Sequence, residues 1–227
     1  MIQLTPDECR VLGVLVEKAQ TTPQQYPMTL NALVNGANQK NNREPVTSLT
    51  EEQVLTAVDG LRTKGMAREV SLSGSRVAKF RHTAREALEI STSDLVVLTE
   101  LLLRGPQTLG EIRGRASRMH PLESLEVTQN ILEGLKGRAE PMVKQLSPAP
   151  GSRAPRFAQL LCANLHPIDA PSPAAPRPHA SVALITSPAS SDDLKRRVAD
   201  LEARIIRLEK ALEASAIGGA GFPTDAD

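Results

Sequence analysis

The order of amphipathic segments constrains the fold of this chain more than any other feature. Apolar residues recur at helical spacing over about 5–20, 29–38 and 50–64. Alternating segments around Val70 and Phe80 then predict two short strands, with a Ser-Gly-Ser turn between them. Helix, helix, helix, strand, turn, strand is the order of a winged helix-turn-helix domain.

The same order of segments recurs in the second half of the chain. Ser93 and Asp94 are expected to begin its first helix, and Val127 is expected to face inward from its third. The elements after that first helix are expected at about 109–118, 124–136, 142–146 and 156–161. A Gly-Ser-Arg tripeptide and a Phe (74–76 and Phe80) recur at one offset as 151–153 and Phe157, which indicates a diverged repeat.

Composition changes abruptly after this repeat. A stretch rich in Pro, Ala and Ser predicts an extended linker, because it can bury little apolar surface. The fold class is therefore mainly α with small β-wings (α+β): two tandem winged helix-turn-helix domains plus a C-terminal coiled-coil helix. The expected segments are winged-helix domains at 1–90 and 91–166, a linker at 167–190, a coiled coil at 191–214 and a disordered tail at 215–227.

The expected coiled coil rests on a heptad pattern with β-branched residues at a and Leu at d. Its seam consists of Leu194, Val198, Leu201, Ile205, Leu208 and Leu212. This pattern favours a parallel homodimer. The alternative is a helix that packs back on its own domain.

Several literal strings of the chain are similar to a known family. TTPQQYP (21–27), LNALVNGANQKNNREPV (30–46), LRGPQT (103–108) and RMH (118–120) resemble the YceH family of bacterial proteins. The resemblance spans about 4–165 and implies two tandem winged-helix domains. It does not supply a mechanism.

Composition limits the protein's chemistry. The formal net charge is +1 and the pI is about 7.8, so the overall basicity of many nucleic-acid-binding domains is missing. Cys9 and Cys162 lie in apolar surroundings and are expected to be buried free thiols, although a disulfide remains an alternative. The absence of a signal peptide pattern and of a long apolar run predicts a cytoplasmic protein with no membrane contact.

No pattern in the chain predicts catalysis. The histidines are scattered, and none is spaced with a second metal ligand. The chain has neither a phosphate-cradling glycine loop nor a nucleophile elbow. Glu51 and Glu52 lie in the first turn of a helix, where carboxylates stabilise the helix dipole. We therefore expect no enzyme activity, no metal and no cofactor.

Double-stranded DNA is the partner that the expected fold favours, although the charge pattern is mixed. Acidic residues, among them Glu51, Glu52 and Glu126, occupy both expected third helices and would repel phosphates there. The candidate nucleic-acid-binding residues lie elsewhere: Asn38, Lys40, Arg43, Arg76, Lys79, Arg81, Arg113, Arg115, Arg118 and Arg153. A solvated polar surface would have the same composition.

The alternative function is a protein-protein interaction adaptor. Winged-helix domains with acidic third helices can dock partners, and a dimerising helix on a linker suits that role. Single-stranded nucleic acid is disfavoured, because the chain has few aromatic side chains on which bases can stack.

Overall fold

The computed structural model describes residues 2–71, 77–162 and 164–166. These residues belong to one compact unit, which extends from Met1 to Pro173. The predicted linker, coiled-coil seam and tail lie outside the described residues, as does Arg76. In the described ranges, no helix is both long enough and apolar enough to cross a lipid bilayer.

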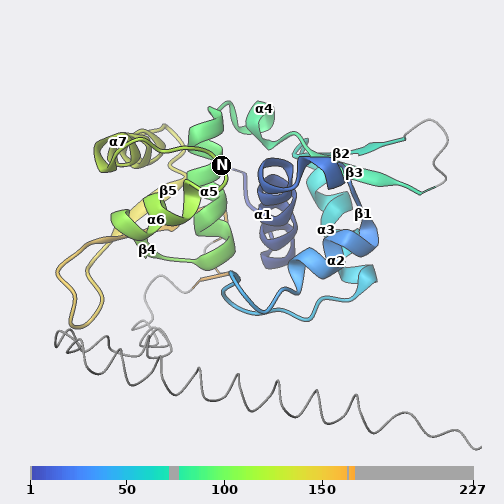
Figure 1. Ribbon diagram of the computed structural model, residues 1–227, viewed down its shortest axis with the longest axis horizontal. Helices are drawn as coiled ribbons and strands as arrows, with labels where there is room; N and C mark the ends of the chain where they lie inside the picture. The colour runs from blue at the N-terminus through green and yellow to red at the C-terminus, as the bar shows by residue number, and fades with distance from the viewer. Residues whose placement is uncertain (1, 72–76, 163, 167–227) are drawn as a thin grey trace, which may run out of the picture. The chain divides into compact units, whose positions relative to one another are not determined.

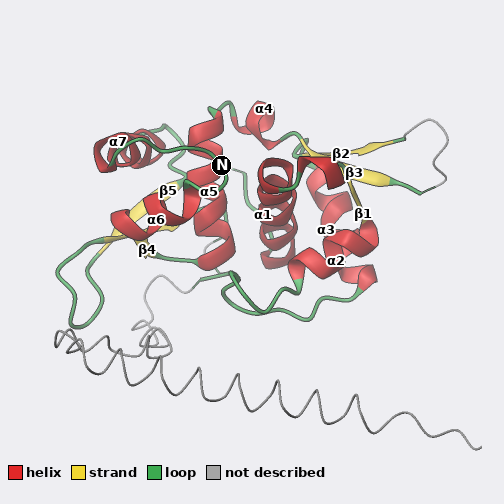
Figure 2. Cartoon of the chain, viewed as in Figure 1, coloured by secondary structure: helices red, strands yellow, loops and turns green. Residues whose placement is uncertain are grey.

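Helices with short strands make up both halves of the described chain (Figures 1 and 2). The N-terminal half consists of α1 (Pro6–Thr21), η1 (Pro23–Gln25), β1 (Met28–Thr29), α2 (Leu30–Ala37), α3 (Glu51–Thr63), β2 (Ala67–Val70), β3 (Lys79–His82) and α4 (Ala84–Leu88). The C-terminal half consists of α5 (Thr92–Arg104), β4 (Gln107–Thr108), α6 (Leu109–Ala116), α7 (Leu125–Lys136), β5 (Val143–Leu146) and β6 (Arg156–Gln159).

Each half contains a small antiparallel sheet with the same topology. The strand orders are β1-β3-β2 and β4-β6-β5. Met28 lies opposite Phe80 in the first sheet, and Gln107 lies opposite Phe157 in the second. The mixed α+β class is thereby confirmed, and the element order is compatible with a winged helix in each half.

The short second helix is built in the same way in both halves. Thr29 caps α2 and Thr108 caps α6, each by accepting a hydrogen bond from a backbone N–H three residues on. The buried positions Leu33 of α2 and Ile112 of α6 follow their caps at equal spacing. Matched caps and matched buried positions are what a diverged repeat predicts.

Helix starts follow local capping chemistry, with one correction. Thr5 with Glu8 forms the predicted capping box of α1. The prediction that Ser93 begins α5 is wrong, because Ser91 is the cap and pairs with Asp94. A capping box needs its acidic partner three residues after the cap, and Asp94 stands at that distance from Ser91.

The inward face of α7 also differs from the prediction. Val127 is 38% exposed, so its predicted inward orientation is wrong. The buried side chains of α7 are Thr128, Leu132 and Leu135. They are spaced by four and three residues, which places them on one helical face that excludes Val127. The two-residue β4 and the five-residue α4 were not predicted, since such short elements show little periodicity.

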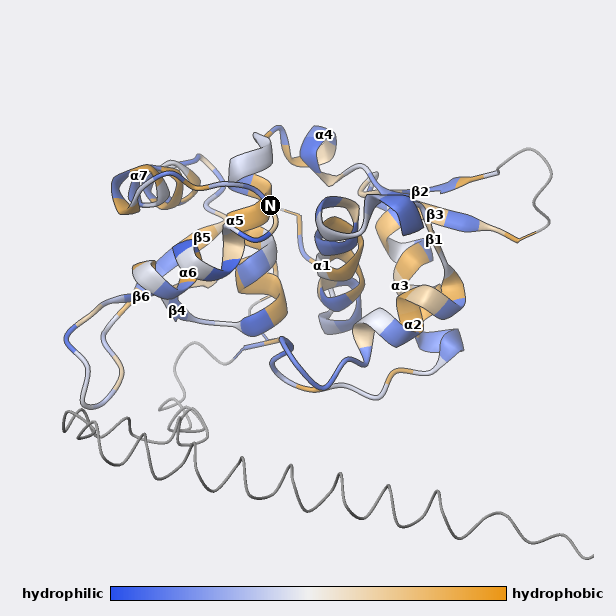
Figure 3. Ribbon diagram, viewed as in Figure 1, coloured by the Kyte–Doolittle hydropathy of each residue, from blue (hydrophilic) through white to orange (hydrophobic). Residues whose placement is uncertain are grey.

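The two halves share one hydrophobic core, which is centred on α1 and α5 (Figure 3). Residues 8–16 of α1 and 95–103 of α5 are all buried. A helix that is buried on all sides lies inside a fold rather than on its surface. The described core runs through both halves and so does not mark a boundary between them. The division into two domains at about residue 90 stays a prediction.

The close approach of α1 to α5 depends on Gly13. A Cβ atom at this position would lie 2.7 Å from Cδ2 of Leu103, and Leu103 is 1% exposed. The Leu103 side chain therefore occupies the space that a larger residue at position 13 would need, and it has little room to move aside.

The variant Gly13→Ala is expected to lower the free energy of unfolding by about 1–3 kcal/mol, because the added methyl overpacks the contact between α1 and α5. Urea unfolding followed by circular dichroism measures the change. Gly134→Ala is the matched control: this exposed glycine of α7 has open space around it, and alanine is expected to stabilise the helix by up to about 1 kcal/mol. Equal stability of Gly13→Ala and wild type would contradict the packing described.

Candidate functional site

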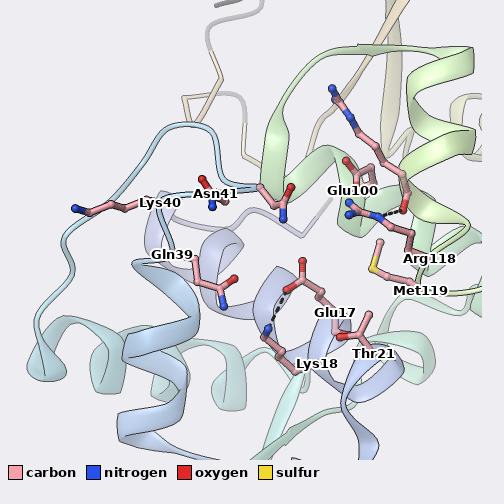
Figure 4. Close-up of a pocket in the computed structure, with 11 residues that line it drawn as sticks. Glu17, Lys18, Thr21, Gln39, Lys40, Asn41, Glu100, Arg118 and Met119 are labelled. Atoms are coloured by element: carbon pink, nitrogen blue, oxygen red, sulfur yellow. Dashed lines mark hydrogen bonds and ion pairs between the residues drawn. The ribbon is translucent and has the colours of Figure 1, made fainter. Parts of the chain in front are cut away.

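A polar cavity of about 470 Å³ lies where residues from both halves meet (Figure 4). The N-terminal half contributes residues from the end of α1 and from the loop after α2, including Lys18 and Lys40. The C-terminal half contributes residues of α5 and from the region of α6, including Arg115 and Arg118. The structure thus brings together Lys40, Arg115 and Arg118, three of the predicted nucleic-acid-binding residues.

The loop after α2 is fixed to α1 by Arg43. Its guanidinium donates two hydrogen bonds to the Glu17 carboxylate, at 2.8 and 3.0 Å, and one to the Gly36 carbonyl at 3.2 Å. Arg43 is only 4% exposed. This arginine, predicted to contact nucleic acid, is therefore engaged in holding the loop in place.

Contacts from both halves hold the same loop. The buried Arg10 of α1 donates a hydrogen bond to the Pro45 carbonyl. From the C-terminal half, the Leu103 carbonyl accepts a 2.8 Å hydrogen bond from the Glu44 N–H, and His166 Nε2 lies 2.5 Å from the Glu44 carbonyl oxygen. The loop that carries Lys40 is thus anchored against both halves.

Asn38 also has a structural role in this loop. Its Nδ2 donates to the Leu49 carbonyl at 2.8 Å, and its Oδ1 accepts from the Leu49 N–H at 2.7 Å. Its amide therefore bridges the two ends of the loop between α2 and α3. These hydrogen bonds occupy the amide groups that were predicted to read base edges.

Each carboxylate that lines the cavity is paired with an arginine. Burial would raise the pKa of Glu17, but the hydrogen bonds and charge of Arg43 outweigh it and hold the pKa below its usual range. Burial raises the pKa of Glu100, although its ion pair with Arg104 opposes this shift. Both carboxylates are thus balanced by arginines that do not themselves line the cavity.

The remaining charged groups at the cavity are cations. Lys18 lies 3.6 Å from Glu17, whereas Lys40 makes no hydrogen bond or ion pair with any residue that the structure describes. Arg115 donates to Gln107 Oε1 at 2.5 Å and lies 3.5 Å from Glu111. Arg118 is exposed, and its Nε donates a long hydrogen bond of 3.4 Å to the Arg115 carbonyl. The cavity therefore carries excess positive charge, with Lys40 and Arg118 exposed and Lys18 and Arg115 half-buried.

The other predicted residues do not join this cavity. Lys79 and Arg81 lie on β3, where Arg81 is opposite Arg68. Arg153 is exposed between β5 and β6. Arg113 donates to the carbonyls of Leu122 and Glu123, at 3.2 and 2.9 Å, and so fixes the loop before α7.

The third helices present acidic and apolar residues to solvent. On α3, Glu51, Glu52 and Asp59 are exposed beside Leu55, which is 40% exposed. On α7, Glu126 is exposed beside Leu125, which is 50% exposed. The predicted acidic character of these helices is thus present on their outer faces.

Sequence reasoning missed Glu17, Lys18 and Glu100 as parts of the site. The Glu100–Arg104 pair has a local signal, because the two residues are four apart on one helix. The Glu17–Arg43 pair has no local signal in the sequence, because only the path of the loop after α2 brings the two residues together. The structure also contains, among its described residues, no group of three or more His, Cys, Asp or Glu side chains arranged to hold a metal.

The fold and site define a mixed α+β protein with a cationic cavity shared by its two halves. Comparison with known proteins gives the family: the chain belongs to the family described as "Protein of unknown function, DUF480", whose model matches residues 4–152. The resemblance to the YceH family is confirmed at this level.

The relatives are bacterial proteins that carry the name UPF0502. The chain is 52% identical to one from Citrifermentans bemidjiense over 153 residues, which cover 67% of this chain and 71% of the relative. It is 49% identical to one from Geobacter sulfurreducens over 160 residues, covering 70% and 73%. A third, from Burkholderia pseudomallei, is 39% identical over 211 residues, covering 93% and 87%.

The variant Glu17→Gln is expected to lower the free energy of unfolding at neutral pH by about 3 kcal/mol, because it leaves the Arg43 charge buried without its partner. The pKa of Glu17 is depressed in the folded state, so the contribution of its charge is present above the ordinary value of 4.5 and is lost as pH falls through the folded value. The difference between wild type and variant should therefore shrink on acidification.

Urea unfolding at neutral pH and at about pH 3 measures this difference. Glu123→Gln is the control, because this side chain is exposed, and its stability change should stay within about 0.5 kcal/mol. A gap between wild type and Glu17→Gln that does not change with pH would contradict the role of the pair.

Proposed function

We propose that each half is a winged helix and that the protein is a non-enzymatic, regulatory protein that binds double-stranded DNA. The observation that supports this proposal is the gathering of Lys40, Arg115 and Arg118 from both halves around one cavity. The carboxylates beside them are paired with Arg43 and Arg104, so their charge does not cancel these cations. Cations that a fold holds close together attract a phosphate backbone.

The proposed contact differs from the usual docking of a winged helix. Glu51, Glu52 and Glu126 on the outer faces of α3 and α7 would meet phosphates at the groove edge and repel them. The proposed contact instead uses the loop after α2 and the end of α6, where Lys40 and Arg118 are exposed. In this proposal, the exposed Arg81 and Arg153 on the wings would make additional phosphate contacts.

Phosphate contacts of this kind give affinity with little sequence information. Asn41, which lines the cavity together with Gln39 and Asn42, carries an amide of the type that can read base edges. A homodimer through the predicted seam from Leu194 to Leu212 would double the number of contacts, and it forms part of this proposal.

The second candidate function is a protein-protein interaction adaptor, which the outer faces of α3 and α7 favour. Leu55 is 40% exposed among acidic residues on α3, and Leu125 is 50% exposed beside Glu126 on α7. An apolar residue with an acidic rim suits a partner that offers an apolar anchor flanked by Lys or Arg.

Lys40→Gln and Arg118→Gln are each expected to weaken binding to random-sequence duplex DNA roughly tenfold, the effect of one charge-assisted hydrogen bond of about 1.5 kcal/mol. Each variant should also reduce the slope of log affinity against log salt by about 0.9, since one phosphate contact is lost. Fluorescence anisotropy of the full chain at several salt concentrations measures both quantities.

Arg62→Gln is the matched control for these variants. It removes the same charge from an exposed arginine of α3 that already pairs with Asp59 at 2.8 Å and Glu69 at 3.6 Å. Its DNA affinity should equal that of wild type. If Arg62→Gln lost affinity and the cavity variants did not, the result would indicate that DNA contacts α3 rather than the cavity. Absence of binding even at low salt would overturn the DNA proposal and favour the adaptor.

A further inference from the structure

The cavity between the two halves has an inner part that contact with duplex DNA does not explain. Its volume of about 470 Å³ is in the range of small-molecule sites. A DNA duplex is wider than such a cavity, so its phosphates reach only side chains at the rim, such as the exposed Lys40 and Arg118. Lys18 and Gln39 also line the cavity but are half-buried, with 22% of the Lys18 side chain exposed. These inner groups are accessible to a ligand smaller than DNA.

Hydrogen-bond donors face the cavity from two sides. Figure 4 shows Lys18 and Gln39 on one side and Arg118 on the other. Arg43 donates a 3.0 Å hydrogen bond to Oε1 of Gln39, which orients this amide and leaves its Nε2 as a donor. Nε of Arg118 donates to the Arg115 carbonyl, whereas its two terminal nitrogens make no hydrogen bond or ion pair with any residue that the structure describes. The cavity therefore offers donors that the protein itself does not use.

The carboxylates of the cavity are engaged already. Glu17 accepts two hydrogen bonds from Arg43, and Glu100 forms its ion pair with Arg104. What remains for a ligand is a set of donors and cations. Phosphate oxygens are the acceptors that arginine and lysine bind most readily, and several cations favour a ligand with more than one phosphate.

The cavity is formed before any ligand enters. Its loop is held by Arg43, by Asn38 and by the hydrogen bond from the Glu44 N–H to the Leu103 carbonyl. A site that is already ordered loses little conformational freedom when a ligand binds. Such a site binds a small molecule better than a loop that must first be ordered.

Other lining groups suit the base of a nucleotide. Met119 contributes a thioether beside Arg118, and thioethers make favourable contacts with aromatic rings. The exposed Asn41 makes no hydrogen bond within the described ranges, so its amide is free to pair with the edge of a base. A nucleotide would use these groups as well as the cations, whereas inorganic polyphosphate would use the cations alone.

We propose that the cavity binds a small molecule with two or three linked phosphate groups, either a nucleotide or inorganic polyphosphate, and that this ligand regulates DNA binding. Lys18, Gln39 and Arg118 bind its phosphates. Because Arg118 also contacts DNA in the function proposed above, the ligand and DNA compete for it. This regulatory part rests on that proposed function, but the binding of the small molecule does not.

Equilibrium dialysis of the full chain against ATP, GTP and tripolyphosphate, without DNA, tests the binding itself. At least one probe is expected to bind with a micromolar dissociation constant. Tighter binding of a nucleotide than of tripolyphosphate supports a nucleotide as the ligand, and equal binding supports recognition of the phosphates alone. Absence of binding of all three at millimolar concentrations overturns the inference and leaves the DNA proposal standing.

Two cavity variants and one control locate the site, and the wild-type measurement stands even if a variant folds poorly. Lys18→Gln is expected to weaken polyphosphate binding roughly tenfold, since one charge-assisted hydrogen bond is lost, and to leave DNA affinity close to that of wild type. Arg118→Gln should weaken both. Arg62→Gln, on the outer face of α3, should change neither. Equal weakening of polyphosphate binding by Arg62→Gln and Lys18→Gln would indicate attraction to the general surface charge and overturn the site.

Competition is measured by fluorescence anisotropy of duplex DNA while the tightest of the three probes is added at constant ionic strength. At ten times its own dissociation constant, the probe is expected to raise the apparent dissociation constant for DNA about tenfold. A probe that binds without changing DNA affinity overturns the regulatory part. If the protein binds the probe but no DNA at all, the DNA proposal fails and the small-molecule site stands.

Discussion

The contact between α1 and α5 is the constraint on which the rest of the described structure depends. Both helices are buried on all sides over residues 8–16 and 95–103, so neither can bury its whole surface against its own half alone. Gly13 allows the approach, because its missing Cβ leaves room for Leu103. Once these helices are in contact, the loop after α2 and the helix α6 are brought to the same cavity.

Buried charge fixes the details of that arrangement. Arg43, at 4% exposed, and Arg10, fully buried, both hold the loop after α2, and burial lowers the pKa of Arg10 to about 10. Burying an arginine is unfavourable unless a partner compensates, and Glu17 compensates for Arg43. The pairing orders the loop and removes Glu17 from the charge balance of the cavity. The cations that remain exposed, Lys40 and Arg118, are those that a phosphate could reach.

Local signals made much of the fold predictable from the sequence. Capping boxes such as Thr5 with Glu8, and apolar periodicity in the longer helices, placed most elements within a few residues of their positions. The same local reasoning was wrong where two patterns competed: Ser93 stood near enough to the true cap, Ser91, to be mistaken for it. Val127 looked inward because it is apolar, whereas the helical face is set by Thr128 and Leu132.

The candidate site was less predictable, because it depends on contacts between distant segments. Lys40 and Arg118 were identified as cations, but nothing in their spacing shows that they line one cavity. Arg43 has the same charge and stands beside Lys40 in the chain, yet it is buried against Glu17. The expectation that Cys9 and Cys162 are buried free thiols is confirmed.

The claim that both halves form one cooperative unit, and therefore one cationic surface, is tested most directly by hydrogen exchange. Amide protection in α2 and α3 would be followed together with that in α6 and α7 across a urea series, by mass spectrometry of peptides. The shared core predicts that both groups lose protection at the same urea concentration, in a single transition. Two separate midpoints, with one half still protected while the other exchanges freely, would contradict it.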